Sequence, residues 1–340
     1  MEIQLGYNDA KKVSEIVEVL EKERFFLLTT HRNIDGDAIG SEIALYSALK
    51  RAGKEAVIVN HDGIPLIYRF LPYTKKVHIC TSELSLTPDV AIVIDCGSSD
   101  RTGNVFKLVK KAKIVVNIDH HFSNPGFANI NWINHNFSAT GEMVYFLISH
   151  FSGNISKKEA ECLYTAILTD TGSFIYNIRP FTMGVVQDLI NKGITPEKIA
   201  KKVYLERPLR SIKLLSLALG NLKFERERKV CWMKISRDMY RKTRTKEEDT
   251  EGFIDLLVKI KEANIVFLIK EAHNNVVKVS LRSKGRFDVE SIASKFGGGG
   301  HKKAAGFYFT GTSLDEVEQK ILREIDKTNS NRKYGWNNPR

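Results

Sequence analysis

The sequence predicts an α/β protein in which a parallel sheet with helices on both faces is followed by a smaller α+β domain. Two observations support this prediction. In the first half, short apolar runs alternate with amphipathic helical patterns, as in sheets with right-handed helical crossovers. In the second half, strand patterns follow one another across short polar turns, and 340 residues suffice for two hydrophobic cores.

The first domain is expected to span residues 1–195. Its predicted strands are continuously apolar, which is typical of strands covered on both faces. They lie at residues 24–30, 56–59, 90–94 and 114–118. Helical patterns occupy residues 38–52, 141–151 and 157–168.

A helical connector rich in Lys and Leu is expected at residues 196–220, followed by the second domain at residues 221–327. The strands predicted there lie at residues 229–235, 265–270 and 276–281, and the helices at 289–296 and 314–325. The polar tail, residues 328–340, is predicted to be disordered because it is rich in Asn, Lys and Arg.

The net charge of +12 is unevenly distributed along the chain. Residues 1–200 hold 21 Lys and Arg against 22 Asp and Glu, whereas residues 201–340 hold 31 against 18. This asymmetry indicates a polyanionic partner for the C-terminal part, and a basic solvated surface explains it equally well.

The composition also bears on the cellular location. No apolar run approaches the roughly 20 residues that span a bilayer, and the N-terminus lacks the apolar core of a signal peptide. The four cysteines have no CxxC spacing, so we expect them to be reduced, and neither a disulfide framework nor a zinc site is indicated. We therefore expect a cytoplasmic protein without a membrane partner.

Acidic and histidine residues cluster directly after the predicted strands. The loop after the first strand carries His31, Asp35 and Asp37, and Asp95 ends the strand at 90–94. The triplet Asp119-His120-His121 ends the strand at 114–118, and Asp170 follows a helical pattern. Because the carboxyl ends of parallel strands meet at one edge of a sheet, these side chains are expected to converge there.

Several carboxylates in one crevice repel each other unless cations lie between them. Oxygen ligands with added imidazole suit Mn²⁺, whereas carboxylates alone favour Mg²⁺. Two such ions about 3.5–4 Å apart could clamp a phosphoryl group and activate a water. Taken singly, each residue has an ordinary structural explanation, such as a helix N-cap for Asp37 or a turn for Asp95. Only their joint placement favours a site with two divalent metal ions.

At this point the chain resembles the DHH phosphoesterases. Asp35-Gly36-Asp37, Asp95, the Asp119-His120-His121 triplet and Asp170 are similar to the family's four signature motifs. The segment Phe296-Gly297-Gly298-Gly299-Gly300-His301 resembles the signature of the DHH-associated C-terminal domain. Within the family, the compact chain is most similar to bacterial nanoRNases that also act as pAp phosphatases. One departure is Ile34, since family members often have proline before the Asp-Gly-Asp.

The resemblance implies a role for each motif residue. His31, Asp35 and Asp95 would hold one Mn²⁺, and Asp95 would be shared with a second ion. The ligands of that second ion would be Asp37, Asp95, His120 and Asp170. His121 would face the substrate phosphate as a donor of a hydrogen bond or proton, and Asp119 would orient a ligand imidazole.

The glycine run of the second domain predicts a phosphate-binding loop. Backbone N–H groups can approach an anion closely at Gly298, Gly299 and Gly300 because no side chains intervene. His301 and the pair Arg282-Ser283 would add donors. The resemblance implies that this loop holds the terminal nucleotide of the substrate.

Three further side chains have two interpretations each. Arg101, six residues after Asp95, could contact a phosphate near the metals or could simply be exposed. The aromatic rings of Phe174 and Tyr176, which follow Asp170, could stack on a base, but we expect them to pack in the core.

The preferred function is a Mn²⁺-dependent hydrolase of short single-stranded oligonucleotides that also removes the 3′-phosphate of pAp; Mg²⁺ stays open as the metal. One alternative is a phosphodiesterase of cyclic or linear dinucleotide second messengers. A catalytically silent nucleotide-binding protein is less favoured because every metal ligand is present. The sequence is compatible with a homodimer and leaves the oligomeric state open.

Overall fold

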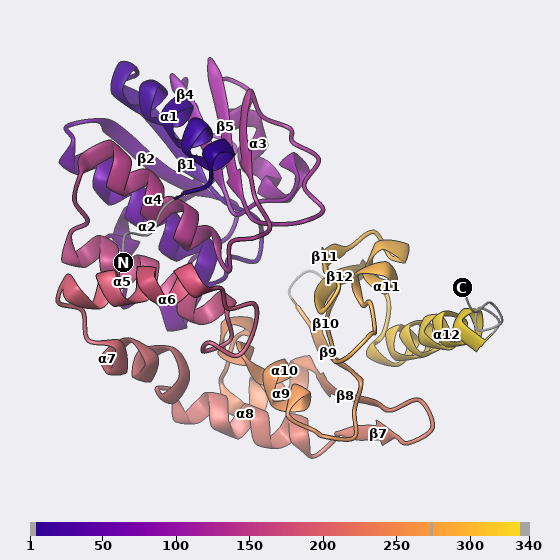
Figure 1. Cartoon of the computed structure of the whole chain (residues 1–340). Coiled ribbons are helices and arrows are strands. Elements are labelled where there is room, and N and C mark those ends of the chain that lie inside the picture. The colour runs from indigo at the N-terminus through magenta and orange to yellow at the C-terminus, as the bar shows by residue number, and fades with distance from the viewer. Residues whose placement is uncertain (1–4, 273–274, 334–340) are drawn as a thin grey trace, which may run out of the picture. The chain divides into compact units, whose positions relative to one another are not determined.

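The structure is a computed structural model that describes residues 5–272 and 275–333 (Figure 1). Its contacts divide the chain into two compact units, Met1–Glu206 and Arg207–Arg340. The division falls inside the segment expected as a connector. There the chain forms α7 (Pro196–Ala200), a π-helical turn (Lys201–Leu205) and α8 (Leu209–Leu219).

The first unit contains a six-stranded sheet in which all strands are parallel, in the order β3-β2-β1-β4-β5-β6. The four strands predicted from apolar runs are β1 (Phe25–Thr29), β2 (Glu55–Asn60), β4 (Val90–Ile94) and β5 (Ile114–Asp119). The two edge strands, β3 (Val77–Ile79) and β6 (Ile130–Ile133), were not predicted.

Helices cover both faces of this sheet, which confirms the predicted fold class. On one face, Phe26 and Leu28 pack in a core with the helices α1 (Tyr7–Lys22), α2 (Gly36–Arg51), α4 (Thr140–Ser152) and α5 (Lys157–Asp170). On the other face, Leu27 packs with a 3₁₀ segment (Ser99–Val105) and the short helix α3 (Phe106–Val109). Helix α6 (Pro180–Asn191) and short 3₁₀ turns at Leu66–Tyr68 and Thr74–Lys76 complete the unit.

Helices α2 and α5 pack unusually closely, and two glycines make this contact feasible. A Cβ atom at Gly36 would lie 2.3 Å from Thr169 Oγ1, and one at Gly40 would lie 2.5 Å from the backbone oxygen of Cys162. The close approach brings the start of α2, which carries Asp35 and Asp37, next to the end of α5. Asp170 is the last residue of α5, two residues beyond the helix end that the sequence predicted.

The second unit has a mixed six-stranded sheet in the order β11-β12-β10-β9-β8-β7. Its strands are β7 (Lys223–Glu225), β8 (Val230–Ile235), β9 (Ile265–Glu271), β10 (Val276–Ser283), β11 (Gly299–His301) and β12 (Ala304–Thr310). Only β8 and β9 pair in parallel. The predicted α+β domain is therefore present, and β7, β11 and β12 are additions to it.

The helices of this unit also cover both sheet faces. One core contains residues of α11 (Glu290–Lys295) and α12 (Leu314–Lys333), and the other contains residues of α8 and α10 (Phe253–Val258). Helix α9 (Arg237–Thr243) and a 3₁₀ turn (Glu247–Thr250) precede α10. Because α12 continues to Lys333, the first six residues of the predicted disordered tail are helical, and residues 334–340 lie outside the described residues.

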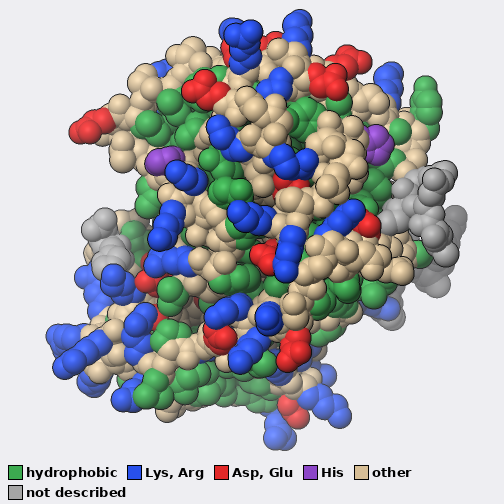
Figure 2. Space-filling model, turned by 90° about the vertical axis from the view of Figure 1, so that its left-hand side faces the viewer, with side chains coloured by type: hydrophobic (Ala, Val, Ile, Leu, Met, Phe, Trp, Pro, Cys, Tyr) green, Lys and Arg blue, Asp and Glu red, His purple; other side chains and the backbone are tan. Residues whose placement is uncertain are grey.

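The surface and the helices bear on the charge and membrane predictions. Lys and Arg side chains are dispersed over the face displayed in Figure 2 rather than gathered into one patch. Across the described ranges 5–272 and 275–333, no helix has both the length and the apolar character required to cross a bilayer.

Candidate metal centre

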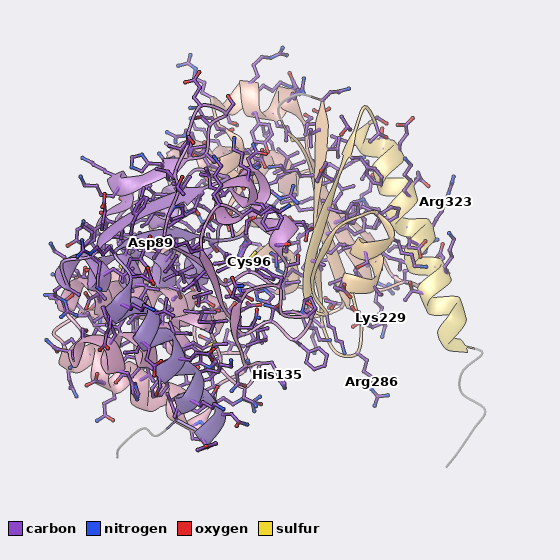
Figure 3. The ribbon with its side chains drawn as sticks, turned by 90° about the horizontal axis from the view of Figure 1, so that it is seen from above. Asp89, Cys96, His135, Lys229, Arg286 and Arg323 are labelled. Atoms are coloured by element: carbon purple, nitrogen blue, oxygen red, sulfur yellow. The ribbon has the colours of Figure 1, made fainter. Side chains whose placement is uncertain are left out.

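The predicted ligands converge at the carboxyl ends of β1, β4 and β5. The strand order reverses between β1 and β4, and a crevice opens at such a point in an open α/β sheet. Cys96, labelled in Figure 3, directly follows Asp95 and marks the site, whereas Asp89 marks the opposite end of β4. The six proposed ligands come from loops and helix ends that this sheet edge brings together.

A first cluster consists of His31, Asp35 and Asp95. His31 Nε2 lies 3.7 Å from Asp35 Oδ2 and 3.6 Å from Asp95 Oδ2. The other ring nitrogen, Nδ1, lies 2.7 Å from the carbonyl oxygen of Arg32, which can only accept a hydrogen bond. The proton of neutral His31 is therefore held on Nδ1, and Nε2 presents its lone pair to the carboxylates.

A second cluster consists of Asp37, His120 and Asp170. His120 Nε2 lies 3.7 Å from Asp37 Oδ2 and 3.4 Å from Asp170 Oδ2, and its Nδ1 lies 3.3 Å from the carbonyl oxygen of Phe137. This is the same arrangement as at His31. A backbone carbonyl behind a metal-binding imidazole commonly fixes the ring in this way.

Asp95 connects the two clusters. Its Oδ2 faces His31, while its Oδ1 lies 3.8 Å from His120 Nε2 and 3.5 Å from His121 Nδ1. The backbone of Asp95 is left-handed, with φ of 54°, a conformation that costs free energy in residues other than glycine. The fold tolerates this strain at the residue whose two oxygens face both groups of ligands.

The electrostatics of the site reflect crowded buried carboxylates. Burial, together with Asp95 and Asp170, raises the pKa of Asp37 well above its usual range. Burial raises the pKa of Asp170 to about 6, and the neighbouring carboxylates, against the opposition of burial, raise the pKa of His120 to about 8. Burial also opposes the ionisation of Asp95, but the three surrounding imidazoles outweigh it and hold the pKa of this carboxyl below its usual range.

The donor set fits divalent metal ions. Asp37 and Asp95 are only 1% and 2% exposed, so their charges need compensating cations. The nitrogen-to-oxygen separations of 3.4–3.8 Å in both clusters are generally too long for hydrogen bonds. Such separations suit donor atoms that would hold a cation between them. Asp35 and Asp170, with side chains 51% and 30% exposed, form the open side.

Asp119 orients His121 rather than an imidazole of the proposed metal ligands. Its Oδ1 lies 2.6 Å from His121 Nδ1, while Asn124 Nδ2 donates to its Oδ2 at 2.6 Å. Burial opposes the charge of Asp119, but His121 outweighs this and lowers the pKa of the carboxyl. The ionised Asp119 accepts a hydrogen bond from His121 Nδ1, which fixes the orientation of the ring.

The start of α4 contributes groups that the sequence analysis missed. The backbone N–H groups of Thr140 and Gly141 donate to the two oxygens of Asp37 at 2.7 and 2.8 Å, and the Thr140 hydroxyl donates to Asp95 Oδ1 at 2.9 Å. A helix N-terminus favours negative charge, so α4 holds both carboxylates in place. The small residues Ser138-Ala139-Thr140-Gly141 are the signal that could have indicated this helix start.

Arg101 lies close to the site. It belongs to the 3₁₀ segment after β4, its carbonyl accepts the N–H of Arg32 at 2.7 Å, and its charge opposes protonation of His31. The phosphate contact considered for Arg101 stays a prediction.

The substrate-binding residues expected in the second unit lie on adjacent strands. In the sheet, Ala304 of β12 pairs with Arg282 of β10 on one side and with His301 of β11 on the other. The Ser283 hydroxyl donates to the Phe287 carbonyl at 2.7 Å, so this group already supports the local turn.

The three glycines expected to bind phosphate differ in their surroundings. A Cβ at Gly298 would lie 2.2 Å from the Gly306 carbonyl, and one at Gly300 would lie 2.4 Å from the Ala304 carbonyl. Both glycines are therefore required by packing. Gly299 has open space around its Cα, so an anion could approach the backbone there.

Comparisons with known proteins show which family the chain resembles. Residues 26–167 match the DHH family, N-terminal domain, and residues 229–331 match the DHHA1 domain. The bifunctional oligoribonuclease and PAP phosphatase NrnA of Thermus thermophilus is 31% identical over 92% of this chain and 92% of its own length. The protein of the same name from Bacillus subtilis is 26% identical over 92% of this chain and 97% of its own.

Solved structures show the same fold. An exopolyphosphatase-related protein from Bacteroides fragilis superposes with a TM-score of 0.86 at 26% identity, covering 94% of this chain and 96% of its own. Exonuclease RecJ bound to manganese shares the fold with a TM-score of 0.60 at 12% identity, covering 96% of each chain. On the strength of the whole-length relative and both domain matches, the chain belongs to the DHH family of phosphoesterases.

Proposed function

We propose that this protein is a Mn²⁺-dependent phosphoesterase that hydrolyses short single-stranded oligonucleotides and removes the 3′-phosphate of pAp. The observation that carries the proposal is the convergence of six acidic and imidazole side chains in two clusters that Asp95 connects. The full-length relatives named oligoribonuclease and PAP phosphatase support the substrate class, and the manganese in RecJ supports the metal.

Each cluster supplies ligands for one of the two proposed ions. His31, Asp35 and Asp95 would hold one ion, and the second would be held by Asp37, Asp95, His120 and Asp170. When bound, such a pair of ions supplies Lewis acidity that lowers the pKa of a water and stabilises charge on a phosphoryl group. The hydrogen bonds from α4 keep Asp37 and Asp95 in place before substrate arrives, so little reorganisation is needed.

His121 is proposed as the group that serves the leaving oxygen. With Nδ1 bound to Asp119, the ring can deliver a proton from Nε2 to an alkoxide as the phosphate ester breaks. This role would use His121, a histidine that lies outside both proposed ligand sets.

The second unit is proposed to bind the terminal nucleotide. Gly299 offers an accessible backbone, with Gly298 and Gly300 shaping the loop, and Arg282 and His301 lie on the strands that flank β12. Arg101 would add a cation near the metals. We also propose a cytoplasmic location, because all four cysteines are buried free thiols, as in a reducing compartment.

The test is hydrolysis by the purified full-length chain of a labelled RNA dinucleotide, of pAp and of a cyclic dinucleotide, each with Mn²⁺, with Mg²⁺ and with chelator. The proposal predicts mononucleotide from the first and phosphate from the second, in Mn²⁺ only or most rapidly. Preference for the cyclic substrate would favour a second-messenger phosphodiesterase. Binding of these nucleotides without any turnover would indicate a silent nucleotide-binding protein.

A further inference from the structure

The segment that follows the ligand Asp170 has an unusual backbone. Gly172, Ser173, Phe174 and Asn177 are all left-handed, with φ between 53° and 62°. Three of these four residues have side chains, which disfavour this conformation. Such strain persists only where the surrounding structure enforces it, and it is typical of ligand-binding segments.

The surrounding contacts hold this segment firmly. The carbonyl oxygen of Thr171 accepts the N–H groups of Ile175 and Tyr176, each at 2.9 Å, and the Thr171 hydroxyl accepts the N–H of Phe174 at 3.1 Å. At the far end, the hydroxyl of Ser138 donates to the Asn177 carbonyl at 2.6 Å. These hydrogen bonds define the backbone conformation of the turn.

The two aromatic side chains of this turn have different environments. Phe174 packs against the core beside Tyr164, as expected. Tyr176 is 56% exposed, so the expectation that it packs in the core is wrong. The exposed side chain beside it, Ile175, leaves 71% of its surface accessible. This turn, whose backbone is strained, therefore exposes an aromatic ring to solvent.

The position of the Tyr176 ring is set by Gly172. A Cβ atom at Gly172 would lie 2.7 and 2.8 Å from Tyr176 Cδ2 and Cε2, so one edge of the ring rests directly on the glycine backbone. Gly172 is two residues from Asp170, at most about 7 Å along the chain. The ring therefore contacts a residue close in the chain to Asp170, and more than half of the Tyr176 surface is accessible.

We propose that Tyr176 is a stacking platform for the nucleobase next to the phosphate that is hydrolysed. The inference rests on the proposed function and adds a specificity residue to it. Every nucleobase has a π-face, and stacking on an aromatic ring is tolerant of base identity. A fixed tyrosine here would favour substrates that carry a base beside the reacting phosphate, without selecting one sequence.

The experiment uses the full-length protein with Tyr176→Leu, which removes the ring, and Tyr176→Phe, which keeps it. Tyr7→Leu, at a tyrosine 84% exposed on α1, is the matched control. Two substrates are compared: an RNA dinucleotide and its analogue with both bases replaced by hydrogen. A second readout is the fluorescence of 2-aminopurine ribonucleoside monophosphate, which is quenched when the base stacks.

With the dinucleotide, we expect Tyr176→Leu to raise KM about tenfold or more, the size of one lost base stack, with kcat within about twofold. The base-free analogue should show little change in KM, and Tyr176→Phe and Tyr7→Leu should match the wild-type protein. Quenching of 2-aminopurine should be weakened by Tyr176→Leu alone.

Equal KM increases for both substrates, no increase for the dinucleotide, or quenching that Tyr176→Leu leaves unchanged would each overturn the proposal. If no form of the protein hydrolyses any substrate, the proposed function fails. The fluorescence comparison, which requires no turnover, then still decides whether Tyr176 stacks on a base.

Discussion

His121 Nδ1 and Asp119 Oδ1 lie 2.6 Å apart, and the Asn124 amide holds the second oxygen of Asp119 at the same distance. The carboxylate is thus held on both sides and accepts a hydrogen bond from each partner. This pair sets the orientation of the His121 ring, which we propose serves the leaving oxygen.

Replacing Asp119 with Asn is expected to lower kcat by about 100-fold, because an imidazole with the wrong tautomer and orientation is a poor proton donor. The affinity for Mn²⁺ should change little, since Asp119 belongs to neither proposed ligand set. Steady-state kinetics and metal titration measure the two effects. Asn124→Ala, which removes one contact to the carboxylate, should cost less; wild-type kcat in Asp119→Asn would contradict the assigned role.

Glu42 gives the protein a distinct pH dependence of stability. The side chain is fully buried, Oε2 accepts the Asn60 amide at 2.7 Å, and burial raises the pKa of Glu42 to about 8. Since the folded state keeps the proton and the unfolded state loses it above about pH 4.5, this contribution to stability falls as pH rises toward 8. It is fully present only below about pH 4.5.

The Glu42→Gln variant should lack this loss, because an amide does not ionise. Relative to the wild-type protein, its free energy of unfolding should rise by roughly 2–3 kcal/mol between pH 5 and pH 7. Urea unfolding with chelator present measures the difference. Glu21→Gln, at an exposed position of α1, is the control, and parallel pH profiles for wild type and Glu42→Gln would refute the prediction.

The close packing of α2 on α5 predicts that Gly40→Ala is costly. The added methyl would lie 2.5 Å from the backbone oxygen of Cys162, which cannot rotate away. We expect a loss of about 2–3 kcal/mol in unfolding free energy. Mn²⁺ affinity should also weaken, because Asp37 and Asp170 would separate. Gly6→Ala, whose methyl would meet Asp9 Oδ2 at an ordinary 3.7 Å, should leave both quantities unchanged.

The central strands could be predicted because their sequences carry long apolar runs. Val90–Ile94 is entirely buried and matches its prediction residue for residue. The edge strands lack this signal, since β3 has three residues and exposes His78 and Ile79. Strand β12 was missed because its small residues at Ala304–Gly306 show no strand pattern, although they pair with the neighbouring β11 as well as with β10.

Part of the candidate metal centre could also be predicted from the sequence. Ligands that directly follow parallel strands must meet at one edge, so the proximity of His31, Asp95 and His120 follows from topology. The hydrogen bond from Thr140 to Asp37 joins residues 103 positions apart and depends on how α4 packs. No local pattern reports such a contact. The exposure of Tyr176 was equally hidden, because it results from the strained turn around Gly172.

Asp95 is the carboxylate that we propose two divalent ions share. The most direct measurement is Mn²⁺ content per chain after equilibrium dialysis, for the wild-type protein and for Asp95→Asn. Asn tolerates the left-handed backbone of residue 95, so the fold should persist. We expect two ions per wild-type chain, and at most one in the variant together with loss of dinucleotide hydrolysis. A fully active wild-type chain with a single ion, or a variant that keeps both ions, would contradict the account.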